Sequence, residues 1–186
     1  SPANYFHVLR RQIHRNFRKP LIIMTPKSPL RHKKNVSHIS EFTDNSTFHR
    51  TLGYNINKQK NTVSRVIICS GKIYFDLIEE KEKINNDNVY IIRLEQLYPF
   101  PYEPLALELE QFKDAELIWC QEEPKNMGAW NTVRNYIDRT LEIIELKNVR
   151  VKYIGRNASS TTATGNYNKH LAEQKKILEK VVGKFN

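Results

Sequence analysis

Strand and helix patterns alternate regularly after residue 62, and this alternation constrains the fold more than any other feature of the chain. Short apolar runs rich in β-branched residues are each followed by a longer segment whose apolar residues recur at helical spacing. The expected strands are Arg65–Cys69, Val89–Leu94, Leu117–Cys120 and Val149–Ile154, and the expected helices are Gly71–Ile84, Pro104–Phe112, Gly128–Thr140 and Asn168–Val182. The pattern predicts an α/β fold, a three-layer sandwich in which a mostly parallel sheet carries helices on both faces.

The first 26 residues have a different pattern and are predicted to be the end of a preceding domain. Apolar residues at near-helical spacing predict a helix over residues 2–18, with Pro2 in its first turn. Pro20 ends this helix, and Leu21–Met24 is expected to form a short buried strand. One helix and one strand cannot bury a core, so they need a sheet supplied by another part of a protein.

Residues 27–62 are polar, show no clear periodicity and are predicted to form an inter-domain linker. Compact domains rarely contain so long an irregular stretch, which favours a connection between domains. The most mobile part of this linker is expected at residues 55–61. The α/β domain then occupies residues 63–186.

The formal net charge of +10 is concentrated in the N-terminal third of the chain. Residues 1–60 hold 12 Lys or Arg and 2 Asp or Glu, whereas residues 61–186 hold equal numbers of basic and acidic residues. A nucleic-acid groove with interleaved aromatic residues is not indicated, because residues 19–41 contain no aromatic side chain other than histidine. No apolar run approaches the roughly 20 residues that a membrane span needs. We therefore expect neither a nucleic acid nor a membrane as partner.

Cys69 and Cys120 each close an apolar run and are expected to be buried thiols without a disulfide. Free thiols suit a reducing compartment, either the bacterial cytoplasm or the mitochondrial matrix. The six histidines show no metal-ligand spacing, and no nucleophile motif is present, so the sequence predicts no metal site and no catalytic residue of its own.

Polar loops follow three of the expected strands, at the edge where α/β proteins place functional groups. Lys72 stands at the start of a helix and is a candidate anion contact, although Ser70 and Gly71 also suit a plain cap and turn. The P-loop spacing is absent, which excludes ATP hydrolysis of that type. If the strands run parallel, Lys72, Glu95 and Glu122 should lie close together.

The loops after the second and third strands suit docking rather than chemistry. Adjacent carboxylates such as Glu122 and Glu123 generally point apart, which argues against a shared acid–base role. Prolines stiffen the loop that carries Tyr98, and Trp130 is interpreted as an anchoring aromatic residue. The candidate interface residues are Glu95, Tyr98, Glu122, Glu123 and Trp130.

Two further segments suit anions. Lys27 and Arg31 belong to a short basic loop that is either a solvated face or a phosphate-binding surface. Near the other end, the small hydroxyl-rich loop Gly155–Gly165 either wraps a phosphate or simply connects two elements, and the role of Arg156 within it stays open.

Several tracts resemble the C-terminal region of the thiamin-diphosphate-dependent component of the 2-oxoglutarate dehydrogenase complex. They are Leu9-Arg-Arg-Gln12, Thr25-Pro-Lys-Ser-Pro-Leu-Arg-His32, Cys69–Leu77, Arg93-Leu-Glu-Gln-Leu-Tyr-Pro-Phe-Pro101, Trp119-Cys-Gln-Glu-Glu-Pro-Lys-Asn-Met-Gly-Ala-Trp130, Tyr153-Ile-Gly-Arg156 and His170 with Glu173-Gln174. The resemblance covers nearly the whole chain, which looks like a fragment of a much longer enzyme. It implies a transketolase-like C-terminal domain in residues 63–186, with residues 1–26 as the last helix and strand of a pyrimidine-binding domain.

The resemblance also implies a function for the full-length enzyme. That enzyme would decarboxylate 2-oxoglutarate oxidatively in the tricarboxylic acid cycle on thiamin diphosphate with Mg²⁺, and pass the succinyl group to a lipoyl-bearing succinyltransferase. It would be a homodimer, and this fragment would support packing, bind no cofactor and be inactive alone. Regulation of some family members by acetyl-CoA or AMP makes Lys27, Arg31 and Lys72 candidate regulator contacts.

Two alternatives remain open at this point. The chain resembles in the same way the corresponding domain of a 2-oxoadipate or other 2-oxoacid dehydrogenase, or of another transketolase-like enzyme. From another class, a basic nucleic-acid-binding module would account for the net charge, and salt-dependent binding would identify it.

Overall fold

The computed structural model describes residues 1–43, 45–54, 62–146 and 149–183. The chain divides into two compact units, unit 1 (Ser1–His49) and unit 2 (Arg50–Asn186). The segment expected to be most mobile, residues 55–61, lies outside the described residues. Among the described residues, no helix is long and apolar enough to cross a membrane.

The described residues of unit 1 form one α-helix and two short 3-10 helices joined by irregular chain. The helix α1 (Pro2–His14) begins with the Ser1 hydroxyl accepting a hydrogen bond from the Asn4 amide. The 3-10 helices are η1 (Ser28–Arg31) and η2 (Ile39–Phe42). Buried polar side chains of α1 tie the unit together, since Asn4 Nδ2 donates to the His49 carbonyl at 2.9 Å.

The structure corrects the expected strand at Leu21–Met24. These residues form neither helix nor strand, and Ile22 and Met24 are 80% and 91% exposed. An apolar run forms a strand only where a neighbouring strand satisfies its backbone groups, and the described residues of unit 1 contain no strand. The helix also ends at His14 rather than residue 18, because Arg15 has extended backbone angles.

Unit 2 is built on a five-stranded sheet with the order β1-β3-β2-β4-β5. The strands are β1 (Thr51–Gly53), β2 (Arg65–Cys69), β3 (Val89–Leu94), β4 (Glu116–Pro124) and β5 (Lys152–Arg156). The pairs β2–β3, β2–β4 and β4–β5 are parallel, and β1 alone pairs antiparallel, with β3. All five residues of β2 are buried, as expected for the centre of a parallel sheet.

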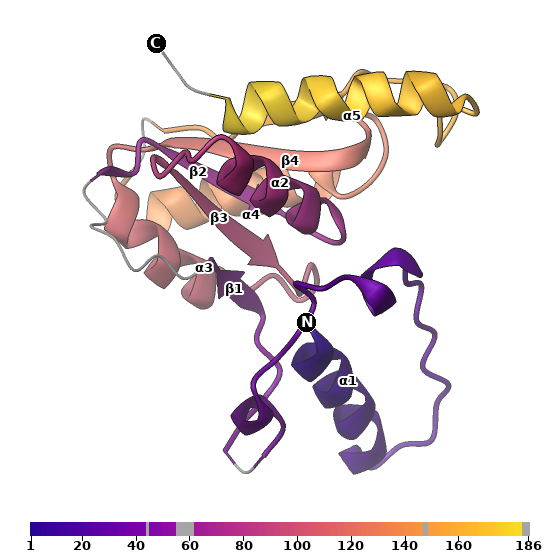
Figure 1. Ribbon diagram of the computed structural model, residues 1–186. Helices are drawn as coiled ribbons and strands as arrows, with labels where there is room; N and C mark the ends of the chain where they lie inside the picture. The colour runs from indigo at the N-terminus through magenta and orange to yellow at the C-terminus, as the bar shows by residue number, and fades with distance from the viewer. Residues whose placement is uncertain (44, 55–61, 147–148, 184–186) are drawn as a thin grey trace. The chain divides into compact units, whose positions relative to one another are not determined.

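Helices cover both faces of this sheet, which confirms the predicted α/β sandwich (Figure 1). The helices are α2 (Ile73–Lys83), α3 (Tyr102–Leu109) continued by η4 (Glu110–Phe112), α4 (Trp130–Ile143) and α5 (Tyr167–Val182). One face packs Ile67 and Cys69 against α2 and α5. The opposite face packs Val66 and Ile68 against α3 and α4. Two hydrophobic cores therefore hold the sheet in place.

Both cysteines are free and buried, as the sequence predicted. Cys69 and Cys120 are partners in the register of β2 and β4 and belong to the same core. Burial raises the pKa of the Cys69 thiol to about 12, against a smaller opposing effect from Arg93. A thiol that is neither exposed nor ionised is a poor nucleophile, so Cys69 acts as a small core residue.

Candidate functional site

The carboxyl ends of β2, β3 and β4 form the first candidate site, at the edge of the sheet. Parallel register aligns Cys69, Arg93 and Cys120, so the residues that follow them leave the sheet at the same level. The chain goes from β2 outward to β3 and then back past β2 to β4, which makes the gap between β2 and β4 the point where the strand order reverses. Open α/β sheets commonly bind ligands outside such a reversal.

An ion pair spans this reversal point. Lys72 Nζ lies 2.5 Å from Glu122 Oε1, and the side chains are 35% and 22% exposed. The structure thus brings together two residues that the sequence predicted at the same edge. An anion that approaches Lys72 must compete with the Glu122 carboxylate. The ion-pair partner of Glu122 is Lys72, so Glu122 does not form a carboxylate pair with Glu123.

Arg93 forms the second cluster at this edge and was not among the predicted site residues. Its guanidinium lies over the Tyr74 ring at 4.0 Å from the centroid, and its Nε is 3.7 Å from Glu95 Oε1. The Arg93 Nε is buried without a hydrogen-bond partner among the described residues. Burial raises the pKa of Tyr74, opposed by the charge of Arg93. An arginine within the otherwise apolar strand Val89–Leu94 was the available sequence signal.

Gln121 organises the loop between β4 and α4 and was also missed. The side chain is 2% exposed, and its Oε1 accepts hydrogen bonds from Trp119 Nε1 at 2.9 Å and from the Trp130 amide at 3.0 Å. Its Nε2 donates to the carbonyls of Pro124 and Met127 at 3.1 and 2.7 Å. One buried amide therefore fixes the end of β4 and the start of α4.

The candidate interface residues differ in exposure. Tyr98 is 82% exposed and Glu123 is exposed, so both stand where a partner could reach them. Trp130 is only 7% exposed and packs against Tyr153, with ring centroids 5.3 Å apart. The expectation that Trp130 lies at an interface is therefore corrected, because the core of unit 2 covers its ring. Its interpretation as an anchoring aromatic residue agrees with this burial.

The basic candidates Lys27 and Arg31 lie in unit 1, at the start and the end of η1, and both are exposed. Lys72 belongs to unit 2. The prediction that each of these residues contacts a regulator stays a prediction.

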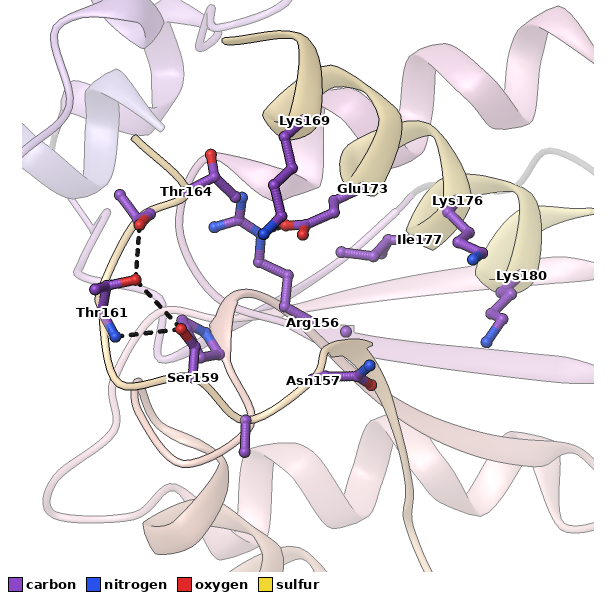
Figure 2. A pocket seen from close by; sticks show the side chains of 14 residues that line it. Arg156, Asn157, Ser159, Thr161, Thr164, Lys169, Glu173, Lys176, Ile177 and Lys180 are labelled. Atoms are coloured by element: carbon purple, nitrogen blue, oxygen red, sulfur yellow. Dashed lines mark hydrogen bonds and ion pairs between the residues drawn. The ribbon is translucent and has the colours of Figure 1, made fainter. Parts of the chain in front are cut away.

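A cavity of about 430 Å³ is the second candidate site of unit 2, between α5 and the loop that follows β5. Four cationic side chains and one carboxylate line it, namely Arg156, Lys169, Lys176, Lys180 and Glu173. Arg156 is 10% exposed and its Nε lies 2.9 Å from Glu173 Oε2. The hydroxyl-rich loop predicted from the sequence forms the opposite wall (Figure 2).

The described parts of the chain hold no group of three or more His, Cys, Asp or Glu side chains arranged to bind a metal ion. The arrangement of the first site suits contact with another protein surface, and that of the second suits an anion.

Comparison with known proteins gives one family and several close relatives. The family described as 2-oxoglutarate dehydrogenase C-terminal matches residues 36–182. The 2-oxoglutarate dehydrogenase E1 component of Brucella anthropi is 53% identical over 192 aligned residues, which cover 98% of this chain. The E1 components of Brucella abortus strain S19 and Brucella ovis are each 52% identical over the same length. The chain spans 19% of the length of these curated relatives.

Proposed function

The chain belongs to the 2-oxoglutarate dehydrogenase C-terminal family, and from this membership we propose that it is the C-terminal part of a 2-oxoglutarate dehydrogenase. The complete enzyme would decarboxylate 2-oxoglutarate oxidatively in the tricarboxylic acid cycle and transfer the succinyl group to the lipoyl arm of a succinyltransferase. The observation that carries the proposal is 53% identity over almost the whole chain to a protein named as that component. The bacterial relatives favour the cytoplasm of a bacterium over the mitochondrial matrix.

The chain's own role in this proposal is packing rather than chemistry. Five large apolar side chains in and just after α1 are more than a third exposed, namely Tyr5, Phe6, Leu9, Ile13 and Phe17. Exposed apolar patches of this kind mark surfaces that pack against other protein. Residues 1–26 would complete a preceding domain, and the edge that carries Glu95, Tyr98 and Glu123 would contact a second domain or the other subunit of a homodimer.

The cofactors implied for the complete enzyme are thiamin diphosphate and Mg²⁺. The described residues provide no converging set of His, Cys, Asp or Glu side chains, so they do not fit a site for Mg²⁺. We therefore derive no step of the decarboxylation from this chain and assign no cofactor contact to it.

Catalytic dependence on the rest of the enzyme can be tested directly. The isolated chain, incubated with 2-oxoglutarate, thiamin diphosphate and Mg²⁺, is expected to release no CO₂, whereas the complete protein should do so. Decarboxylation by the isolated chain would refute the packing role. Faster turnover of 2-oxoadipate than of 2-oxoglutarate by the complete protein would favour the alternative substrate.

The interface can be tested with exposed tyrosines. Replacing Tyr98 by Ala in the complete protein is expected to weaken association of the subunits, measured by analytical ultracentrifugation. The matched control is Tyr167→Ala, because Tyr167 is similarly exposed, at 73% against 82%. Equal effects of the two replacements would remove Tyr98 from the interface.

We also propose that Lys27, Arg31 and Lys72 contact an acidic regulator such as acetyl-CoA or AMP. Exposed cations at the two ends of a short 3-10 helix support the first two, since arginine and lysine suit phosphate groups. The pairing of Lys72 with Glu122 counts against a strong contribution from Lys72. Titration of the complete protein with acetyl-CoA and AMP, before and after Arg31→Gln, tests this, and an unchanged affinity would reject Arg31 as a contact.

A further inference from the structure

The cavity beside α5 has an excess of positive charge that the described residues do not neutralise. Lys169, Lys176 and Lys180 are spaced so that they share one face of the helix, and Figure 2 shows all three side chains leaving α5 on the side of the loop after β5. None of these three lysines forms an ion pair with any described residue. By contrast, Lys175 on another face of the helix pairs with Glu179 at 3.8 Å.

The single carboxylate of the cavity is already engaged. Glu173 Oε2 lies 2.9 Å from Arg156 Nε, and Arg156 also approaches His170 Nδ1 at 3.4 Å. These contacts hold the guanidinium in place and leave the three lysines without a compensating charge in the cavity. Such a concentration of like charges is unfavourable unless an anion or solvent ions offset it.

The start of α5 adds to this charge. Its first turn contains Lys169 and no acidic residue, although a helix N-terminus favours negative charge and disfavours positive charge nearby. An anion in the cavity would offset both the lysines and the helix end. The helix itself is well fixed, since Gln174 Nε2 donates to Asp76 on α2 at 2.7 Å and Arg65 holds the carbonyls at its other end. The lysines are therefore presented from a rigid element.

We propose that this cavity binds the phosphoryl group of a small molecule. Lysine is a common point-charge contact for phosphate, and a volume of about 430 Å³ is within the range of small-molecule sites. Lys176 contacts the phosphoryl oxygens from the middle of α5, Lys169 and Lys180 add positive charge on either side of it, and Arg156, oriented by Glu173, closes the inner end. Ser159, Thr161 and Thr164 line the opposite wall, where small polar side chains leave room for the ligand. This assignment is independent of the catalytic function proposed above.

Neighbouring lysines on α5 allow a sharp test. Inorganic pyrophosphate is titrated into the 186-residue chain by isothermal calorimetry in Mg²⁺-free buffer of low ionic strength, with Lys176→Gln and Lys175→Gln as variants. Both variants lose the same charge from the same helix, but only Lys176 lines the cavity. We expect saturable binding that weakens roughly three- to tenfold in Lys176→Gln and changes less than about twofold in Lys175→Gln.

Further arms separate a phosphoryl site from general attraction of anions. Binding should weaken as salt is added, because exposed charges are screened. Citrate, a carboxylate ligand of comparable charge, should bind more weakly than pyrophosphate. Absence of saturable binding to the wild-type chain, equal losses in the two variants, or citrate binding as tight as pyrophosphate binding would each overturn the proposal. Circular dichroism of each variant checks that its fold is retained.

Discussion

At the residue scale, buried polar side chains hold loops of unit 2 in place. Gln121 connects β4, the following loop and the first turn of α4 through hydrogen bonds from Oε1 and Nε2. Gly128 lies against this amide with a φ of +67°, and a Cβ there would come within 3.0 Å of Gln121 Nε2. The loop conformation therefore depends on a glycine and a glutamine together.

Replacing Gln121 by Leu should destabilise unit 2 strongly. The substitution retains volume but leaves the Trp119 indole N–H and the Trp130 amide buried without their acceptor, which costs about 3 to 4 kcal/mol in the free energy of unfolding. Urea denaturation measures this loss. Gln111→Leu is the control, because Gln111 is exposed, and should change stability by less than about 0.5 kcal/mol. A loss below about 1 kcal/mol for Gln121→Leu would contradict the assigned role.

Glu116 should make stability depend on pH. Burial alone would raise the pKa of its carboxyl, but hydrogen bonds from Lys152 and Arg65 outweigh it and hold the pKa below its ordinary value. A carboxyl group whose pKa is lower in the folded state stabilises the folded protein at pH values above the ordinary pKa of glutamate. This contribution is lost as the pH falls through the lower pKa of the folded state. The carboxylate is about a third exposed, so solvent screening limits the effect.

The measurement compares the wild-type chain with Glu116→Gln across acidic pH. The stability advantage of the wild type should shrink by about 1 kcal/mol as the pH falls from about 5 to 3. Glu110→Gln is the control at an exposed residue, and its curve of unfolding free energy against pH should run parallel to that of the wild type. Parallel curves for Glu116→Gln as well would show that its ion pairs contribute nothing.

The positions of candidate site residues were predictable from the sequence only where the end of a strand determines them. Lys72 and Glu122 each follow an apolar run, and parallel pairing alone brings them to one edge. Gln121 and Arg93 could not be assigned in this way, because their roles depend on which distant side chains surround them. Trp130 was expected at an interface for the same reason, since sequence does not distinguish an aromatic residue covered by its own domain from one covered by a partner.

At the element scale, hydrogen bonds from other parts of unit 2 hold the C-terminal end of α5. Arg65 on β2 donates from Nη1 to the carbonyls of Lys180 and Val181, each at 3.0 Å. Asn86 Nδ2 donates to the Val182 carbonyl at 2.7 Å. These bonds satisfy carbonyl groups that the end of a helix leaves without partners. The side chain of Arg65 is 11% exposed, so the bonds are sheltered from water.

Replacing Arg65 by Met should release this end of α5. Loss of the helix cap and of the ion pair with Glu116 is expected to destabilise unit 2 by about 2 to 3 kcal/mol. Hydrogen exchange should accelerate more in the last turn of α5 than in α4, because only α5 loses its cap. Arg134→Met, on the exposed face of α4, is the control and should leave both helices protected. Uniform acceleration in both helices would point to global destabilisation instead.

Sequence patterns predicted the elements after residue 62 well because each is long enough to show a period. β2 and β3 have the predicted ends, and the helices differ by only a few residues. Strand β1 was missed, since Thr51–Gly53 is too short to alternate and forms only through pairing with β3. Strand β4 continues to Pro124 rather than Cys120, because β5 supplies partners beyond Cys120.

At the scale of the whole molecule, the structure divides the chain at His49 and Arg50, inside the segment predicted as a linker. Residues just after this division belong to the sheet. The Glu95 amide donates to the Arg50 carbonyl at 2.9 Å, and the Tyr54 amide donates to the Ile91 carbonyl at 2.8 Å. Strand β1 therefore covers the edge of β3, which is otherwise open to pairing with other chains.

Two truncated chains distinguish between residue 50 and residue 63 as the start of the α/β domain. A chain of residues 50–186 retains β1, whereas one of residues 63–186, the predicted domain, lacks it. We expect the longer chain to be more stable by about 1 to 3 kcal/mol, because the shorter one loses hydrogen bonds to β3 and exposes apolar surface. Urea denaturation gives the difference in unfolding free energy, and light scattering should detect aggregation only of the shorter chain. Equal stability and equal solubility of the two would place the boundary at residue 63 and reduce β1 to an accessory strand.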